Sequence, residues 1–106
     1  MKPEEVYQLL YFISYLKPQQ RKAFIKLLDN HQIKIIEEAC FNLLKNPQGL
    51  EKAHLAWAKT KKRTIRKLAD DKVKKSDKQK LLTQKGGFIS ALLPVLVSLV
   101  SAFIPQ

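Results

Sequence analysis

The chain has 106 residues and a formal net charge of +11, from twenty Lys and Arg against nine Asp and Glu. That length holds one small domain with appendages. The single cysteine excludes an internal disulfide framework, and the apolar neighbours of Cys40 predict a buried thiol. Residues 1–5 are polar and acidic, so they lack the basic start and the apolar stretch of a secretory signal.

The charge is concentrated in one segment. Residues 59–85 contain twelve Lys and Arg and three Asp and Glu, a net charge of +9, whereas residues 1–58 have a net charge of only +2. Residues 86–106 contain no charged side chain. A polycation joined to an apolar segment is typical of a chain that binds polyanions at one end and packs into protein or lipid at the other.

Three amphipathic helices are expected before the turn at residues 46–49. Pro3 with two glutamates after it starts the first helix, Pro18 starts the second, and Asp29 and Asn30 cap the third. Apolar residues recur at three- and four-residue spacing in this region. These positions are Val6, Leu9, Leu10, Ile13 and Leu16, then Ala23, Phe24, Leu27 and Leu28, and then Ile33, Ile36, Ala39, Cys40, Leu43 and Leu44.

The next segment is expected to stay helical while its surface becomes basic. A helical period begins at Leu50 and continues through residues 60–69 as a basic helix, whose narrow apolar edge is Ile65, Leu68 and Ala69. Asp70–Asp71 is expected to end this helix. Ser76 is the expected cap of a short helix that runs through Leu82.

The predicted fold class is therefore all-α. We divide the chain into a small helical bundle at 1–49, a basic helical arm at 50–85, and a Gly-Gly hinge with a hydrophobic C-terminal helix at 86–106. Four aromatic residues of the first helix are expected in the core because so short a bundle lacks apolar area. They are Tyr7, Tyr11, Phe12 and Tyr15.

The basic arm predicts a contact with phosphates. Like charges on neighbouring helical turns repel one another, and binding to a polyphosphate offsets that repulsion. Ten lysines and two arginines favour neutralisation of a nucleic-acid backbone over the reading of bases. A solubilising arm, or a surface for acidic lipid or protein, is the alternative. The predicted DNA-binding residues are Lys59, Lys61, Lys62, Arg63, Arg66, Lys67, Lys72, Lys74, Lys75, Lys78, Lys80 and Lys85.

The apolar segment at 88–104 is at the short limit of a bilayer span, which needs roughly 17 to 25 residues. Pro94 and three serines interrupt it. It is compatible with a span, with an interfacial helix, or with a peptide that docks into a larger assembly. The predicted hydrophobic anchor consists of Phe88, Ile89, Leu92, Leu93, Val95, Leu96, Val97, Leu99, Val100, Phe103 and Ile104.

The order of these segments resembles a known group. Residues 66–75, then Lys80–Phe88, then a short apolar tail with a proline are similar to small proteins of adenovirus-like elements, the Maverick/Polinton and adintovirus group. That group in turn resembles the adenovirus core protein X, the precursor of the mu peptide. The match covers residues 63–104 of this chain best. The resemblance implies a DNA-binding and DNA-condensing protein of the virion core, present in the virion and the host nucleus. It also implies a maturation-protease site at Gly86 and Gly87.

No catalytic constellation is visible, so we expect no enzymatic activity, no cofactor and no metal. His31 and His54 lack partners at ligand or triad spacing. Glu37–Glu38 and Asp70–Asp71 are adjacent pairs, and neighbours on a helix point about 100° apart. Each pair is expected to be solvated or to cap a helix.

The sequence therefore predicts nonspecific binding of double-stranded DNA through the basic arm, with the tail docked on a capsid or core protein or on another copy of the chain. The alternative is a small membrane-active or tail-anchored protein, whose lysines bind anionic lipid and whose tail enters the bilayer. A third hypothesis is a viral adaptor that uses its N-terminal helices to bind proteins.

Overall fold

A computed structural model describes residues 3–84 and 88–101, which form α-helices, one 3-10 turn and no strand. The all-α prediction is confirmed for these residues. The elements are α1 (Pro3–Tyr15), α2 (Pro18–Lys26), α3 (Asn30–Lys45), the 3-10 turn η1 (Pro47–Gly49), α4 (Lys52–Thr60), α5 (Lys62–Ala69), α6 (Lys75–Leu82) and α7 (Phe88–Ser101).

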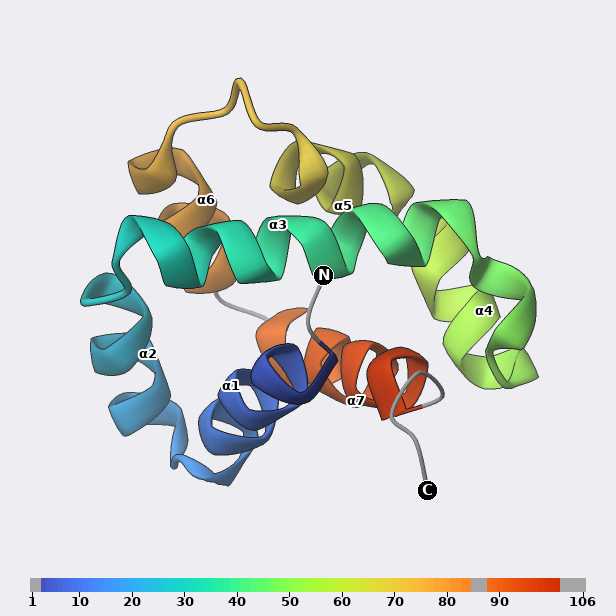
Figure 1. The fold of residues 1–106 in the computed structure, drawn as a ribbon, viewed down its shortest axis with the longest axis horizontal. Helices are drawn as coiled ribbons and strands as arrows, with labels where there is room; N and C mark the ends of the chain where they lie inside the picture. The colour runs from blue at the N-terminus through green and yellow to red at the C-terminus, as the bar shows by residue number, and fades with distance from the viewer. Residues whose placement is uncertain (1–2, 85–87, 102–106) are drawn as a thin grey trace.

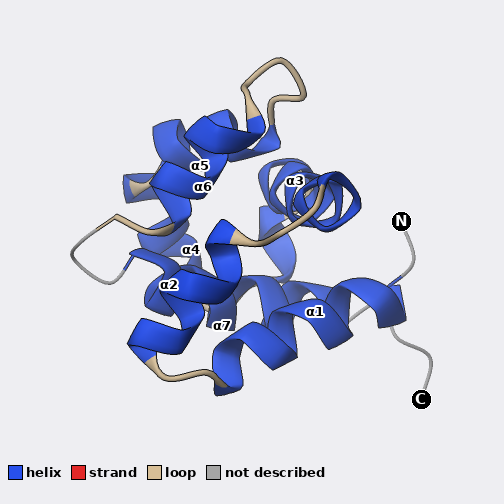
Figure 2. Ribbon diagram, turned by 90° about the vertical axis from the view of Figure 1, so that its left-hand side faces the viewer, coloured by secondary structure: helices blue, strands red, loops and turns tan. Residues whose placement is uncertain are grey.

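Helix α3 runs across the middle of the view in Figure 1, and Figure 2 shows it end-on at one side of the molecule. Helices α5 and α6 lie on one side of it, α1 and α7 lie on the other, and α2 and α4 are near its two ends. The view at 90° shows the same separation of α1 and α7 from α5 and α6 (Figure 2). The residues that α3 buries lie on one broad face of the helix, since successive residues turn by about 100° around its axis. Its buried residues are Ile33, Ile35, Ile36, Ala39, Cys40 and Leu43.

The start of α3 has the cap at Asp29 that the sequence predicts, and this cap is part of a capping box with Gln32, which was not predicted. The Asp29 carboxylate accepts a hydrogen bond from the Gln32 backbone N–H at 2.7 Å. The Gln32 side-chain oxygen accepts in return from the Asp29 N–H at 3.0 Å. The prediction for α6 is wrong by two residues: the cap is Lys74 and not Ser76, because the Lys74 carbonyl already accepts the backbone N–H of Lys78.

Tyr11, Phe12 and Tyr15 are exposed, so the prediction that they lie in the core is wrong, whereas Tyr7 is partly buried and packs against the core. Helix α1 buries the stripe of Val6, Leu10 and Ile13, and the tyrosines lie on another face. Tyr15 is 72 % exposed, and its ring contacts that of Tyr11 with centroids 4.8 Å apart. Helix α7, and not these aromatic rings, supplies the apolar area that the short N-terminal helices lack.

The apolar face of α2 also differs from the prediction. The structure buries Ile25 and Leu28. Leu27 follows the last residue of the helix and is 80 % exposed, and Ala23 is exposed as well. The prediction is therefore confirmed for Leu28 and for Phe24, which is partly buried, and wrong for Ala23 and Leu27. Helix α2 ends at Lys26, so the periodicity did not extend to Leu27.

The uncharged segment forms α7 and packs beside α1 and α3. One cluster of buried residues joins side chains from 1–49, 50–85 and 86–106, so the three segments of the sequence share a core. The Phe88 ring lies 5.6 Å from the Trp57 ring, measured between centroids, and Pro94 is exposed. Of the predicted anchor residues, Phe103 and Ile104 lie outside the described residues. The structure buries Phe88, Leu92, Leu93, Val95, Leu96, Leu99 and Val100, and it partly buries Ile89 and Val97.

No helix in residues 3–84 or 88–101 combines the length and the apolar character that a membrane crossing requires.

Arg21 connects the end of α1 to the start of α7. Its Nε donates to the Ile13 carbonyl at 3.2 Å, and its Nη2 donates to the Leu16 carbonyl at 3.2 Å. Its Nη1 donates to the Ser90 hydroxyl at 2.7 Å. A single guanidinium therefore donates to carbonyls at the C-terminal end of α1 and holds the first turn of α7 beside them.

If α7 belongs to the core, a cavity at its centre destabilises the whole protein. Leu96 is fully buried. We expect Leu96→Ala to lower the free energy of unfolding by about 2–5 kcal/mol, measured by urea denaturation with circular dichroism. The matched control is Leu27→Ala, which removes the same atoms from an exposed position and is expected to change it by less than about 0.5 kcal/mol. Equal effects of the two substitutions would contradict this packing.

The prediction of a buried thiol is confirmed. Cys40 is fully buried, and its burial raises the pKa of the thiol to about 12, with Lys78 opposing the shift. At pH 8 we therefore expect Ellman's reagent to leave the native protein unlabelled over minutes and to label the urea-unfolded protein promptly. Because only the unfolded state ionises at an ordinary thiol pKa, the free energy of unfolding should fall as pH rises above about 9. Rapid labelling of the native protein would show that α3 opens at Cys40.

Candidate nucleic-acid interface

The position of α5 places its cations on the surface. Ile65 and Leu68 are buried and Ala69 is partly buried, so the apolar edge that the sequence predicts is confirmed. Helix α5 packs against α3. The basic residues flank this edge and all of them are exposed. With the last residues of α4 they form what we call the cationic face. It consists of Lys59, Lys61, Lys62, Arg63, Arg66 and Lys67.

The helix that carries these cations is interrupted, which the sequence did not predict. Lys61 is both the C-cap of α4 and the N-cap of α5. Its backbone N–H donates to the Trp57 carbonyl at 3.1 Å, and its carbonyl accepts from the Ile65 N–H at 3.0 Å. The two helices have different partners, because Trp57 packs on Phe88 of α7 whereas α5 lies along α3. The break at Lys61 turns the chain from one partner to the other.

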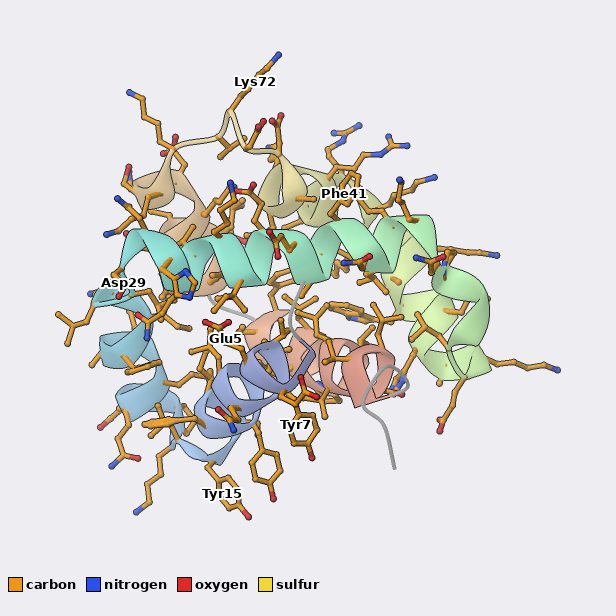
Figure 3. The ribbon with its side chains drawn as sticks, viewed as in Figure 1. Glu5, Tyr7, Tyr15, Asp29, Phe41 and Lys72 are labelled. Atoms are coloured by element: carbon orange, nitrogen blue, oxygen red, sulfur yellow. The ribbon has the colours of Figure 1, made fainter. Side chains whose placement is uncertain are left out.

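The other predicted cations lie beyond Asp70. Lys72 extends from the apex of the loop between α5 and α6 (Figure 3). Lys74, Lys75 and Lys80 are also exposed, at the start of α6 and along it. Lys85, Gly86 and Gly87, which include the predicted protease site, lie outside the described residues.

Lys78 is the exception among the predicted DNA-binding residues that the structure describes. Its side chain is buried, and its Nζ donates to Glu37 Oε2 on α3 at 2.6 Å. The neighbouring Gln79 donates from its Nε2 to the carbonyls of Ile25 and Lys26 at the end of α2. Lys78 therefore holds α6 against α3, and we remove it from the candidate interface.

Acidic residues gather in a groove between α3 and the end of α5. The groove has a volume of about 420 Å³ and is lined by Lys34, Glu37, Glu38, Phe41, Ala69, Asp70 and Asp71. The two acidic pairs are more than 30 residues apart in the sequence, and the packing of α3 against α5 brings them together. Carboxylates repel phosphates, so this groove separates the cationic face from the lysines of the loop and of α6.

Phe41 at the groove is 48 % exposed, and the Lys45 ammonium lies 5.0 Å from the centroid of its ring. This cation–π contact holds one more positive charge close to α5. Neither Phe41 nor Lys45 was among the predicted site residues. The signal that identifies them is their place on the face of α3 toward α5, which the sequence alone does not give.

The two histidines do not lie together. His31 pairs with Glu5 and thereby joins α3 to α1. The buried Nδ1 of His54 has no hydrogen-bond partner among the described residues. In that part of the chain, no three His, Cys, Asp or Glu side chains are grouped so that they could hold a metal ion.

Comparison with known proteins found no matching family model, no matching curated protein and no matching solved structure.

The structural role of the buried pair of Lys78 and Glu37 can be tested by substituting each residue. Glu37→Leu leaves a buried ammonium without a partner, and we expect it to lower the free energy of unfolding by about 3–5 kcal/mol. Adding Lys78→Met removes the orphaned charge, so the double variant should recover most of that loss. Urea denaturation of the two single variants and of the double variant measures the coupling. Additive losses would contradict a direct pairing of these side chains.

Proposed function

We propose that the protein binds double-stranded DNA without sequence specificity through the cationic face. The observation that carries the proposal is the charge of α4 and α5: residues 52–69 contain no carboxylate, and six exposed cations follow one another between Lys59 and Lys67. Crowded like charges oppose folding, and contact with phosphates offsets that cost by releasing condensed counterions.

The chemistry of the face suits backbone contacts better than base readout. Four of its six cations are lysines, which act as compact point charges on flexible stems, whereas specific contacts to guanine favour the bidentate fork of arginine. Asn and Gln, which read adenine, are absent from residues 52–69. We therefore assign these cations to phosphates of either strand, and we assign no base contact.

The resemblance to core proteins of adenovirus-like elements supports a role in the virion core, where DNA must be neutralised to be packed. The membrane alternative requires the apolar side chains of α7 in a bilayer. Those side chains lie in the same core as Val6, Leu10 and Ile13 of α1. Burial of α7 therefore favours DNA as the partner of the basic residues.

Neutralising part of the cationic face tests the proposal. We expect Arg66→Gln with Lys67→Gln to weaken binding to every duplex sequence about equally and to reduce the slope of log affinity against log salt by about 2. The matched control is Lys22→Gln with Lys26→Gln, which removes the same charge from exposed positions on α2. Fluorescence anisotropy with labelled duplexes of equal length and different sequence gives the affinities.

The control variant should bind nearly as the unmodified protein does at moderate salt. If both double variants lose affinity equally, binding follows net charge and is not located on α5. If the unmodified protein binds no duplex even in dilute salt, the proposal is wrong. Because α7 belongs to the core, these measurements use the full chain and not a truncation of residues 88–106.

A further inference from the structure

An apolar pocket opens within the cationic face. Its volume is about 130 Å³, and Leu43, Leu44, Pro47, Leu55, Ala58, Lys59, Lys62 and Ile65 line it. The apolar lining comes from the end of α3, from η1, and from α4 and α5, while Lys59 and Lys62 bring ammonium groups. No carboxylate is among these residues, so the pocket combines an apolar interior with positive charge alone.

The break at Lys61 builds this pocket. It allows α4 and α5 to turn relative to each other, so that Ala58 and Lys59 on one helix and Lys62 and Ile65 on the next line a common space. Lys59 and Lys62 are exposed, and neither has an ion-pair partner among the described residues. They are therefore free to bind an anion beside the pocket.

The volume of the pocket limits the size of the group that it can bind. An apolar cavity of about 150 Å³ takes one benzene molecule, so a pocket of about 130 Å³ holds a single aliphatic side chain. The acyl chain of a lipid has more than twice as many carbon atoms as benzene and does not fit. The two ammonium groups require negative charge beside the apolar group. An apolar residue between acidic residues satisfies both conditions.

We propose that this pocket binds an acidic protein segment through one leucine-sized side chain, with flanking carboxylates on Lys59 and Lys62. The segment uses two cations of the cationic face, so it competes with DNA for them. Direct binding of the segment does not depend on the proposed function, whereas the competition does. An acidic partner of this kind would release or restrict the bound DNA.

The direct test uses a labelled peptide, acetyl-Glu-Glu-Leu-Glu-Glu-amide, and its counterpart with alanine in place of leucine. Burying the leucine side chain should make the first peptide bind about tenfold more tightly to the full chain, because full burial contributes at least about 1.5 kcal/mol. Equal affinities for the two peptides would show that only charge attracts them, and would overturn the proposal.

Two variants locate the binding. Ala58→Leu fills the pocket, and leucine is a good helix former, so α4 should stay intact. The preference for the leucine peptide should then vanish, while both peptides still bind weakly. Lys59→Gln with Lys62→Gln should weaken both peptides and leave the ratio unchanged, whereas the control Lys74→Gln with Lys75→Gln should affect them less. Circular dichroism confirms that each variant is folded. A preference that survives Ala58→Leu contradicts the pocket as the site.

Competition is measured with a labelled duplex bound to the unmodified protein. The leucine peptide should displace the duplex at about one-tenth of the concentration that the alanine peptide needs, and Ala58→Leu should abolish that difference. Displacement by octanoate at lower concentrations than by the peptide would assign the pocket to aliphatic carboxylates and overturn the proposal. A protein that binds the leucine peptide and no duplex refutes the proposed function and leaves the pocket assignment standing.

Discussion

Burial of α7 is the constraint on which the rest of the structure depends. A helix without a charged residue and with apolar side chains on most of its surface cannot remain in water, because the exposed area would associate with any other apolar surface. The six helices before it are short and amphipathic, and chains of this size bury only a modest fraction of their surface. Helix α7 supplies the apolar area that they lack. The aromatic residues of α1 are thereby left for the surface.

The same arrangement explains where the charge lies. Helix α7 and the broad apolar face of α3 fill the interior, so α5 and α6 contact the core only along narrow apolar edges. Nearly every lysine of the basic segment must then face solvent, and repulsion among them opposes the compact state. One lysine is used internally, in the pair with Glu37 that fixes α6. A polyanion that binds the remaining lysines stabilises the folded state, because it favours the conformation that gathers them.

Local features of the fold were predictable from the sequence, and features that depend on distant partners were not. The cap at Asp29, the buried stripe of α3 and the apolar edge of α5 follow from residues within a few turns of one another. The burial of Lys78 depends on Glu37, which is 41 residues away. The break at Lys61 depends on the different partners of α4 and α5. The candidate site shows the same division, since its cations were predictable and its pocket and acidic groove were not.

The contact between α1 and α7 joins the beginning of the described chain to its end. Beside this contact, Arg21 of α2 hydrogen-bonds to Ser90 of α7, and these two residues are 69 residues apart. Closing so long a loop costs entropy before any contact is made, so the α1–α7 contact is expected to form late in folding. During synthesis at roughly 5–20 residues per second, α1 to α3 leave the ribosome several seconds before α7 follows. In that interval the half-formed interior is open, and chaperones or neighbouring nascent chains can reach it.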